Sequence, residues 1–140
     1  TPGLVIVQAY EPDAQAVRLA ARHDFESFAN AELAARLDAR LPPAGRMARI
    51  VCRDRDFEKA RTAATSLAET LRAAAAGTRV EVLGPAPCAI ARIATFFRFE
   101  VLVIAPTARL IQDCLGALRQ QGQLKSDART AVDVDPVALM

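Results

Sequence analysis

The sequence predicts an α+β fold in which two helices cover one face of a four-stranded antiparallel sheet. From residue 46 onward, segments with a two-residue apolar period and segments with a three- and four-residue apolar period follow each other in the order β-α-β-β-α-β. With right-handed crossovers, that order packs as a split βαβ, or ferredoxin-like, arrangement. A chain of 140 residues that is 52% hydrophobic can bury the core that this arrangement needs.

Residues 1–44 are predicted to form a separate region of one strand and two helices. The apolar run Leu4–Ala9 is typical of a buried strand, and Pro12 suits the first turn of a helix over 13–22. A second helix is capped by Asp24, and its apolar face consists of Phe25, Phe28, Ala29, Leu33 and Leu37. A helix cannot run through Pro42-Pro43, so we place the boundary between residues 1–44 and 45–140.

The second region, residues 45–140, contains the four strands and two helices of the predicted sheet domain. Its first strand alternates, with Ala48, Ile50 and Cys52 on the inward side. The predicted elements are strand 46–53, a helix that starts after Asp54 or Asp56 and ends at Gly77, strand 79–83, a rigid connection over 84–87, strand 96–104, a helix from Thr107 to Gly122, and strand 129–134 before Asp135-Pro136.

Charge and cysteine content restrict the function classes only weakly. The net charge is +2, and every basic residue except Lys59 and Lys125 is Arg. Arg suits phosphate and carboxylate recognition, although genomic base composition explains an Arg bias equally well. The three Cys lack paired spacing, which favours a reducing, cytoplasmic compartment. The apolar stretches are too short to span a bilayer, so no membrane partner is expected.

Alternation also predicts the solvent face of the sheet. The residues expected on it are Arg49, Arg53, Arg79, Glu81, Arg98, Glu100, Arg129 and Asp133. This face could position DNA through phosphate contacts, or it could be a charged docking surface; alternation alone leaves both open. Phe97 and Phe99 fall on the inward side, which argues against a sheet that stacks bases on exposed aromatic rings.

Several segments, taken in order, resemble the PriA family of replication-restart helicases. They are Pro2–Gln8, Asp24–Phe28 with Glu32-Leu33, Pro42-Pro43, Val82–Pro87, Ile90–Arg92, Phe97–Phe99, Ala105-Pro106 and Val132–Pro136. The resemblance implies a ribosomal-protein-S10-like fold for residues 45–140, behind a remnant of the second helicase lobe. The chain also lacks an initiator Met, so we expect it to be a piece of a longer protein.

The resemblance further implies that the longer protein is an ATP-dependent 3′-to-5′ DNA helicase that assembles the primosome at stalled forks, using ATP, Mg²⁺ and Zn²⁺. Its partners would be single-stranded or forked DNA, the single-stranded-DNA-binding protein and other primosome proteins. The DNA-binding candidates in this chain are Arg49, Arg53, Arg79, Arg92, Arg98 and Arg129. The family's basic hairpin is replaced by the uncharged Ile93–Phe96, which puts its DNA contacts in doubt and suggests a docking tip instead.

For the partner's acidic tail, the family uses an Arg and a Gln one turn apart at the start of a helix. Gln112 matches the Gln, and Arg109 lies one position from the family's Arg. This implies a peptide-binding role for Arg109 and Gln112, because an acidic tail needs a cation for its carboxylates.

No residue of this chain is predicted to be catalytic or to bind a metal or cofactor. There is no GxxxxGK[ST] loop, and His23 is the only His. Asp133 and Asp135 are expected to close the sheet and form the turn before Pro136. Two further hypotheses remain: a docking module with little DNA binding, and an acylphosphatase-type hydrolase, which is disfavoured because the only Asn, Asn30, lies outside the sheet domain.

Overall fold

The computed structural model describes residues 3–136, and in this range four helices and four strands follow one another. Their bounds are α1 Gln15–Ala21, α2 Phe25–Asp38, β1 Arg46–Asp54, α3 Phe57–Ala75, β2 Glu81–Ile93, β3 Phe96–Ala105, α4 Ala108–Gln120 and β4 Thr130–Val134. The strands form one sheet in the order β2-β3-β1-β4, and every neighbouring pair is antiparallel. Helix α3 connects two strands that flank β3, and α4 connects two strands that flank β1. This interleaved pair confirms the predicted split βαβ fold.

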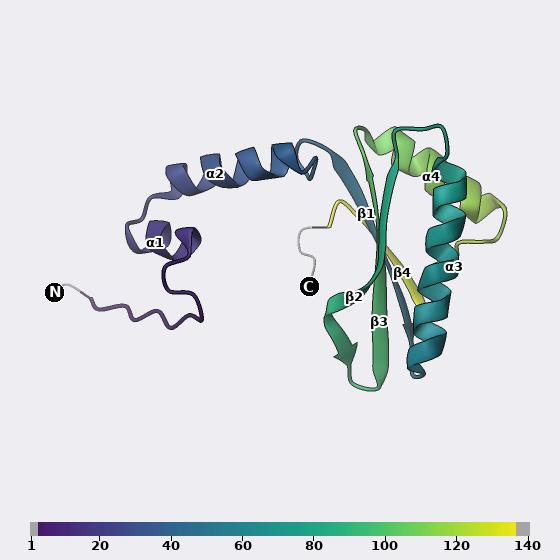
Figure 1. Cartoon of the computed structure of the whole chain (residues 1–140), viewed down its shortest axis with the longest axis horizontal. Coiled ribbons are helices and arrows are strands. Elements are labelled where there is room, and N and C mark those ends of the chain that lie inside the picture. The colour runs from purple at the N-terminus through teal and green to yellow at the C-terminus, as the bar shows by residue number, and fades with distance from the viewer. Residues whose placement is uncertain (1–2, 137–140) are drawn as a thin grey trace.

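The core lies between one face of the sheet and the two helices α3 and α4, which both cover that face (Figure 1). The inward residues predicted on β1, Ala48, Ile50 and Cys52, are all buried there. The helices contribute the apolar residues Ala60, Ala64, Leu67, Ala68, Leu71, Ile111, Cys114, Leu115 and Leu118. Burial of each large aliphatic side chain contributes about 1.5–3 kcal/mol, so this face is the main source of stability.

The helix ends are set by local signals. Asp24 caps α2 by accepting a hydrogen bond from the Ser27 N–H at 3.1 Å, as predicted. Of the two alternatives for α3, the structure selects Asp56, whose carboxylate accepts from the Lys59 N–H at 3.0 Å. Thr107 precedes α4 as predicted, but its side chain makes no capping bond.

Strand β2 differs from the prediction of a short strand followed by a rigid connection. It runs as far as Ile93, with register shifts between Leu83 and Ala86 and between Pro87 and Arg92. An edge strand tolerates prolines when their missing N–H groups need no ladder partner. At Gly84, φ is +93° and an added Cβ would lie 2.8 Å from the Glu100 carbonyl oxygen, so the backbone there requires glycine.

The predicted buried strand Leu4–Ala9 is wrong. These residues form no strand, and Leu4, Val5 and Ile6 are 84–88% exposed. Among the described residues no strand lies beside this segment to accept its backbone groups, which is why the apolar pattern alone was misleading.

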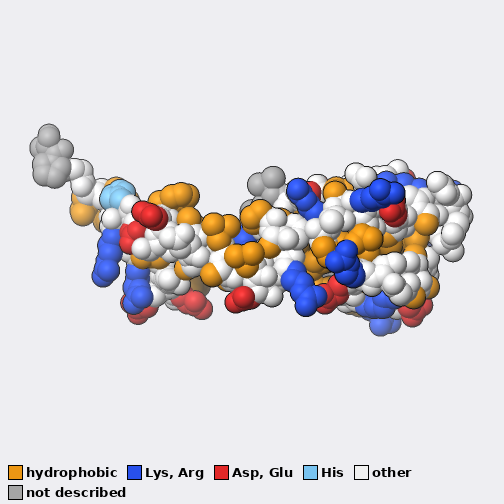
Figure 2. All heavy atoms as spheres, turned by 90° about the horizontal axis from the view of Figure 1, so that it is seen from above, with side chains coloured by type: hydrophobic (Ala, Val, Ile, Leu, Met, Phe, Trp, Pro, Cys, Tyr) orange, Lys and Arg blue, Asp and Glu red, His pale blue; other side chains and the backbone are white. Residues whose placement is uncertain are grey.

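Residues 3–38, which we call the N-terminal arm, project from the side of the sheet opposite α3 and α4 (Figure 1). Helices α1 and α2 occur as predicted, yet the expected apolar face of α2 is largely in solvent: Phe25 is 76% and Leu37 62% exposed. Figure 2 shows hydrophobic side chains on the surface of this arm. The boundary between residues 1–44 and 45–140 stays a prediction.

Candidate nucleic-acid interface

Basic side chains gather at one end of the sheet, where β1 and β2 end and β3 and β4 begin (the lower end in Figure 1). We call this surface the basic end; it comprises Arg53, Arg55, Lys59, Arg92, Arg98 and Arg129. It contains four of the six predicted DNA-binding residues. Arg55 and Lys59 were missed by the sequence analysis, although they flank the cap of α3 and so lie beside the end of β1.

Arg53 and Arg98 form a directly opposed pair on neighbouring strands β1 and β3. Arg53 Nε donates to the Ala128 carbonyl oxygen at 2.7 Å, and Arg98 Nη1 donates to the Ile90 carbonyl oxygen at 3.1 Å. Carbonyl acceptors orient a guanidinium group without neutralising its charge. Within residues 3–136, no carboxylate lies within 4.0 Å of Arg53, Arg92 or Arg98. The two residues oppose each other across the strands, but their guanidinium groups are directed toward opposite neighbours, one beside β4 and the other on β2. Both positive charges are therefore left for an anion to neutralise.

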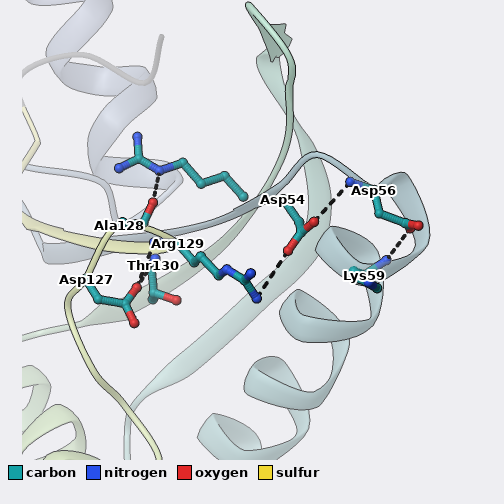
Figure 3. A network of polar contacts seen from close by, with 8 residues as sticks. Asp54, Asp56, Lys59, Asp127, Ala128, Arg129 and Thr130 are labelled. Atoms are coloured by element: carbon teal, nitrogen blue, oxygen red, sulfur yellow. Dashed lines mark hydrogen bonds and ion pairs between the residues drawn. The ribbon is translucent and has the colours of Figure 1, made fainter.

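A polar network holds Arg129 at the same end (Figure 3). Its guanidinium lies 3.5 Å from Asp54 Oδ2. The carboxylate of Asp127 accepts from the backbone N–H groups of Arg129 and Thr130, at 2.7 and 2.9 Å. Backbone hydrogen bonds lower the pKa of both Asp54 and Asp127, so these carboxylates stay ionised. The Arg129 side chain remains 75% exposed and available to a ligand.

A hollow of about 470 Å³ opens beside this network, between the first turns of α3 and the adjoining ends of β1 and β4. Lys59 and Arg129 line it together with Asp54 and Glu58. Arg53 also lines this hollow, so its two acids lie beside one member of the Arg53–Arg98 pair.

Aromatic rings accompany the cations. The Arg55 guanidinium carbon lies 5.6 Å from the Phe96 ring centroid, and that of Arg92 lies 5.1 Å from the Phe97 centroid. These distances are typical of cation–π contacts. Phe97 and Phe99 face the helices, as predicted, and both rings contact Phe57 at the start of α3.

Arg49 does not belong to this surface, and its predicted place on a solvent face is wrong. Its side chain is 6% exposed, and its Nε lies 2.6 Å from Glu100 Oε2, whose side chain is 15% exposed. The middle of this face also buries Met47, Val51 and Ile104. Alternation identified which face Arg49 lies on, but that face is covered at its centre.

The other candidates lie elsewhere. Arg79 precedes β2 at the opposite end of the sheet and lines a cavity of about 590 Å³ with Leu37 and Arg40. Arg109 and Gln112 are both exposed on α4, one turn apart and therefore on the same side of the helix. Arg109 is 88% exposed and 3.7 Å from Asp113. The structure therefore brings Arg109 and Gln112 together but separates Arg79 from the basic end.

Asp135 and the three cysteines have roles in the structure of the sheet domain and its core. Asp135 Oδ1 accepts from the Met47 N–H and Oδ2 pairs with Arg46, both at 3.1 Å, which agrees with the sheet-closing role predicted for it. Cys52, Cys88 and Cys114 are buried thiols, and burial raises the pKa of Cys52 to about 11. Between residues 3 and 136, no three His, Cys, Asp or Glu side chains gather as a metal ion would require. In the same range no helix is long and apolar enough to cross a bilayer.

Comparison with known proteins adds an independent observation. Residues 37–137 match the family model described as the primosomal protein N C-terminal domain. The chain is 35% identical over 138 residues to the replication restart protein PriA of Treponema pallidum, covering 99% of this chain and 21% of that protein. It is 33% identical to the replication restart protein PriA of Synechocystis (99% of this chain, 16% of that protein). It is also 34% identical to the probable replication restart protein PriA of Deinococcus radiodurans (95% and 14%). The chain thus spans about a fifth or less of the length of these relatives.

Proposed function

Since the chain belongs to the primosomal protein N C-terminal domain family, we propose that it is the DNA- and partner-binding end of a replication-restart helicase. In this proposal the chain itself is not catalytic. The unwinding of DNA, and the ATP, Mg²⁺ and Zn²⁺ it uses, belong to other parts of a longer, cytoplasmic protein. The family membership supports a role in replication restart, and the geometry of the basic end supports the binding of phosphate groups.

The observation that carries the proposal is the opposed pair Arg53 and Arg98. Both guanidinium groups are oriented by backbone carbonyls and have no carboxylate within 4.0 Å among the described residues. A phosphodiester supplies the missing negative charge, and guanidinium groups bind phosphate oxygens in a forked geometry. Such contacts fix the position of the DNA without reading its sequence.

The experiment measures fluorescence anisotropy of single-stranded and forked oligonucleotides between about 50 and 200 mM salt. For a single strand, log K falls with log salt by about 0.7 per neutralised phosphate. The double variant Arg53→Gln/Arg98→Gln should therefore weaken binding and flatten this slope by roughly 1.4.

The matched control is Arg79→Gln, which removes one charge from the opposite end of the sheet and should change binding little. It is compared with Arg53→Gln alone, which should flatten the slope by about 0.7. An equal loss in both proteins would contradict the placement of the interface. Binding by the native chain that does not depend on salt would contradict phosphate contacts altogether.

A docking role has its own support in the exposed N-terminal arm. Leu4, Val5 and Ile6 are 84–88% exposed and Phe25 is 76% exposed, and large apolar side chains gathered on a surface mark interaction sites. In this second candidate function the arm packs against the helicase motor, and Arg109 with Gln112 binds the acidic tail of single-stranded-DNA-binding protein. Arg109→Ala and Gln112→Ala would then reduce binding of a tail peptide, measured by titration calorimetry, and leave DNA binding intact.

A further inference from the structure

The most exposed aromatic ring of the sheet domain lies at the basic end. Phe57 opens the apolar face of α3, yet it is 46% exposed, whereas Ala60, Ala64 and Leu71 of the same face are buried. Its centroid lies 5.5 Å from that of Phe97 and 5.4 Å from that of Phe99, with interplanar angles of 90° and 68°. Since Phe99 is itself buried, these edge contacts hold the Phe57 ring in place while the residue as a whole stays 46% exposed.

Cations lead from the opposed arginine pair to this ring. Arg53 and Arg98 lie on the sheet face away from the helices, whereas Phe97 and Phe57 lie on the helix side. At this end of the sheet Arg55 pairs with Phe96 at the start of β3, and Arg92 pairs with Phe97, whose ring lies on the helix side. A strand whose phosphates contact Arg53 and Arg98 can therefore pass over the end of the sheet toward Phe57.

The chemistry of the surface distinguishes single strands from duplexes. Bases in a duplex are stacked on both faces and cannot offer one to a protein ring, whereas an unpaired base can. Interleaved cations and aromatic rings are the composition that binds single strands without sequence preference.

We propose that Phe57 is a stacking platform for an unpaired base, which makes the basic end selective for single-stranded DNA. The inference rests on the proposed function, because the phosphate contacts at Arg53 and Arg98 must exist for a strand to reach Phe57.

The test compares three ligands in anisotropy titrations of the whole chain: a short oligothymidine, an abasic backbone of the same length and charge, and a duplex of that length. The native chain should bind oligothymidine at least about fivefold more tightly than the abasic backbone, the lower limit of what one base–aromatic stack contributes. Phe57→Leu should abolish this difference and leave duplex and abasic binding unchanged. Phe57→Tyr, which keeps the aromatic face, should retain it.

Phe25→Leu is the matched control, because Phe25 is also exposed but lies in the N-terminal arm; it should change nothing. If the native chain prefers oligothymidine and Phe57→Leu keeps that preference, or if Phe57→Leu weakens all three ligands equally, the stacking role is overturned while DNA binding stands. If the native chain binds none of the three ligands, the proposed function and this inference both fail. If Phe57→Tyr loses the preference together with Phe57→Leu, the aromatic face is not what recognises the base.

Discussion

The ion pair between Arg49 and Glu100 allows two influences on the strength of a salt bridge, burial and distance, to be measured separately. Its Nε–Oε2 distance is 2.6 Å, and the side chains are 6% and 15% exposed. Arg61 and Glu58 on α3 form a pair with the same 2.6 Å separation, but their side chains are 56% and 64% exposed. Glu100→Gln and Glu58→Gln therefore remove the same charge at the same distance in two different environments.

The expected costs differ several-fold. Removal of one partner of a buried pair leaves an uncompensated buried charge and costs about 3–5 kcal/mol. We expect the lower end, about 3 kcal/mol, for Glu100→Gln, because Glu100 keeps some contact with solvent. Glu58→Gln should cost about 0.5 kcal/mol or less, as for other exposed helix pairs. The first loss is a large part of a typical unfolding free energy of about 5–15 kcal/mol.

Urea unfolding followed by circular dichroism measures both variants. With a slope of about 1–3 kcal/mol per molar urea, Glu100→Gln should lower the midpoint by about 1–3 M, and Glu58→Gln should hardly move it. The double variant Arg49→Met/Glu100→Leu removes both charges and should recover most of the stability. Equal midpoints for Glu100→Gln and Glu58→Gln would refute the reasoning, because burial would then not decide the strength of the pair. DNA affinity of the folded Glu100→Gln protein should match that of the native chain, since Arg49 lies inside the molecule.

Three further predictions concern the rest of the sheet domain. Backbone N–H donors lower the pKa of Asp127 in the folded protein. The ionised carboxylate therefore stabilises the fold above pH about 4, and this contribution is lost as the pH falls through the lower folded-state pKa. In Asp127→Asn, the urea midpoint should depend less on pH below about 4. Gly84→Ala should destabilise the protein by more than about 1 kcal/mol in urea unfolding, because φ is +93° and the new Cβ meets the Glu100 carbonyl, whereas Gly116→Ala, with open space in α4, should stabilise it. The buried thiols, with the pKa of Cys52 raised to about 11, should resist alkylation near pH 8 until urea unfolds the chain, because only an accessible thiolate reacts; rapid labelling of the native chain would contradict their burial.

The elements that could be predicted are those whose signals are local. Helix α3 begins at the Asp56 cap and presents Ala60, Ala64 and Leu67 on one side, and both features can be found within a few residues of sequence. Strand β2 was predicted too short, because Gly84 and the prolines after it normally interrupt a strand. Only its pairing with β3 shows that it continues to Ile93 as an irregular edge strand.

For the candidate site, alternation could suggest a set of arginines but not their neighbours. Arg53 and Arg98 are 45 positions apart in the chain, and only the β1–β3 register makes them face each other. Arg49 lies on the same face of the sheet, and it was predicted to contact a ligand. The centre of that face is buried, however, so Arg49 instead forms a buried ion pair with Glu100.

By itself, the sequence determined the family, the order of the strands and helices from α1 onward, and most residues of the core, because hydrophobic periodicity and caps act over a few residues. It did not determine that Leu4–Ala9 would be exposed, nor where each arginine would lie. Those outcomes depend on contacts between segments far apart in the chain, and such contacts exist only once the sheet has formed. The tertiary structure alone therefore decided which charges are neutralised inside the protein and which are left at its surface for a ligand.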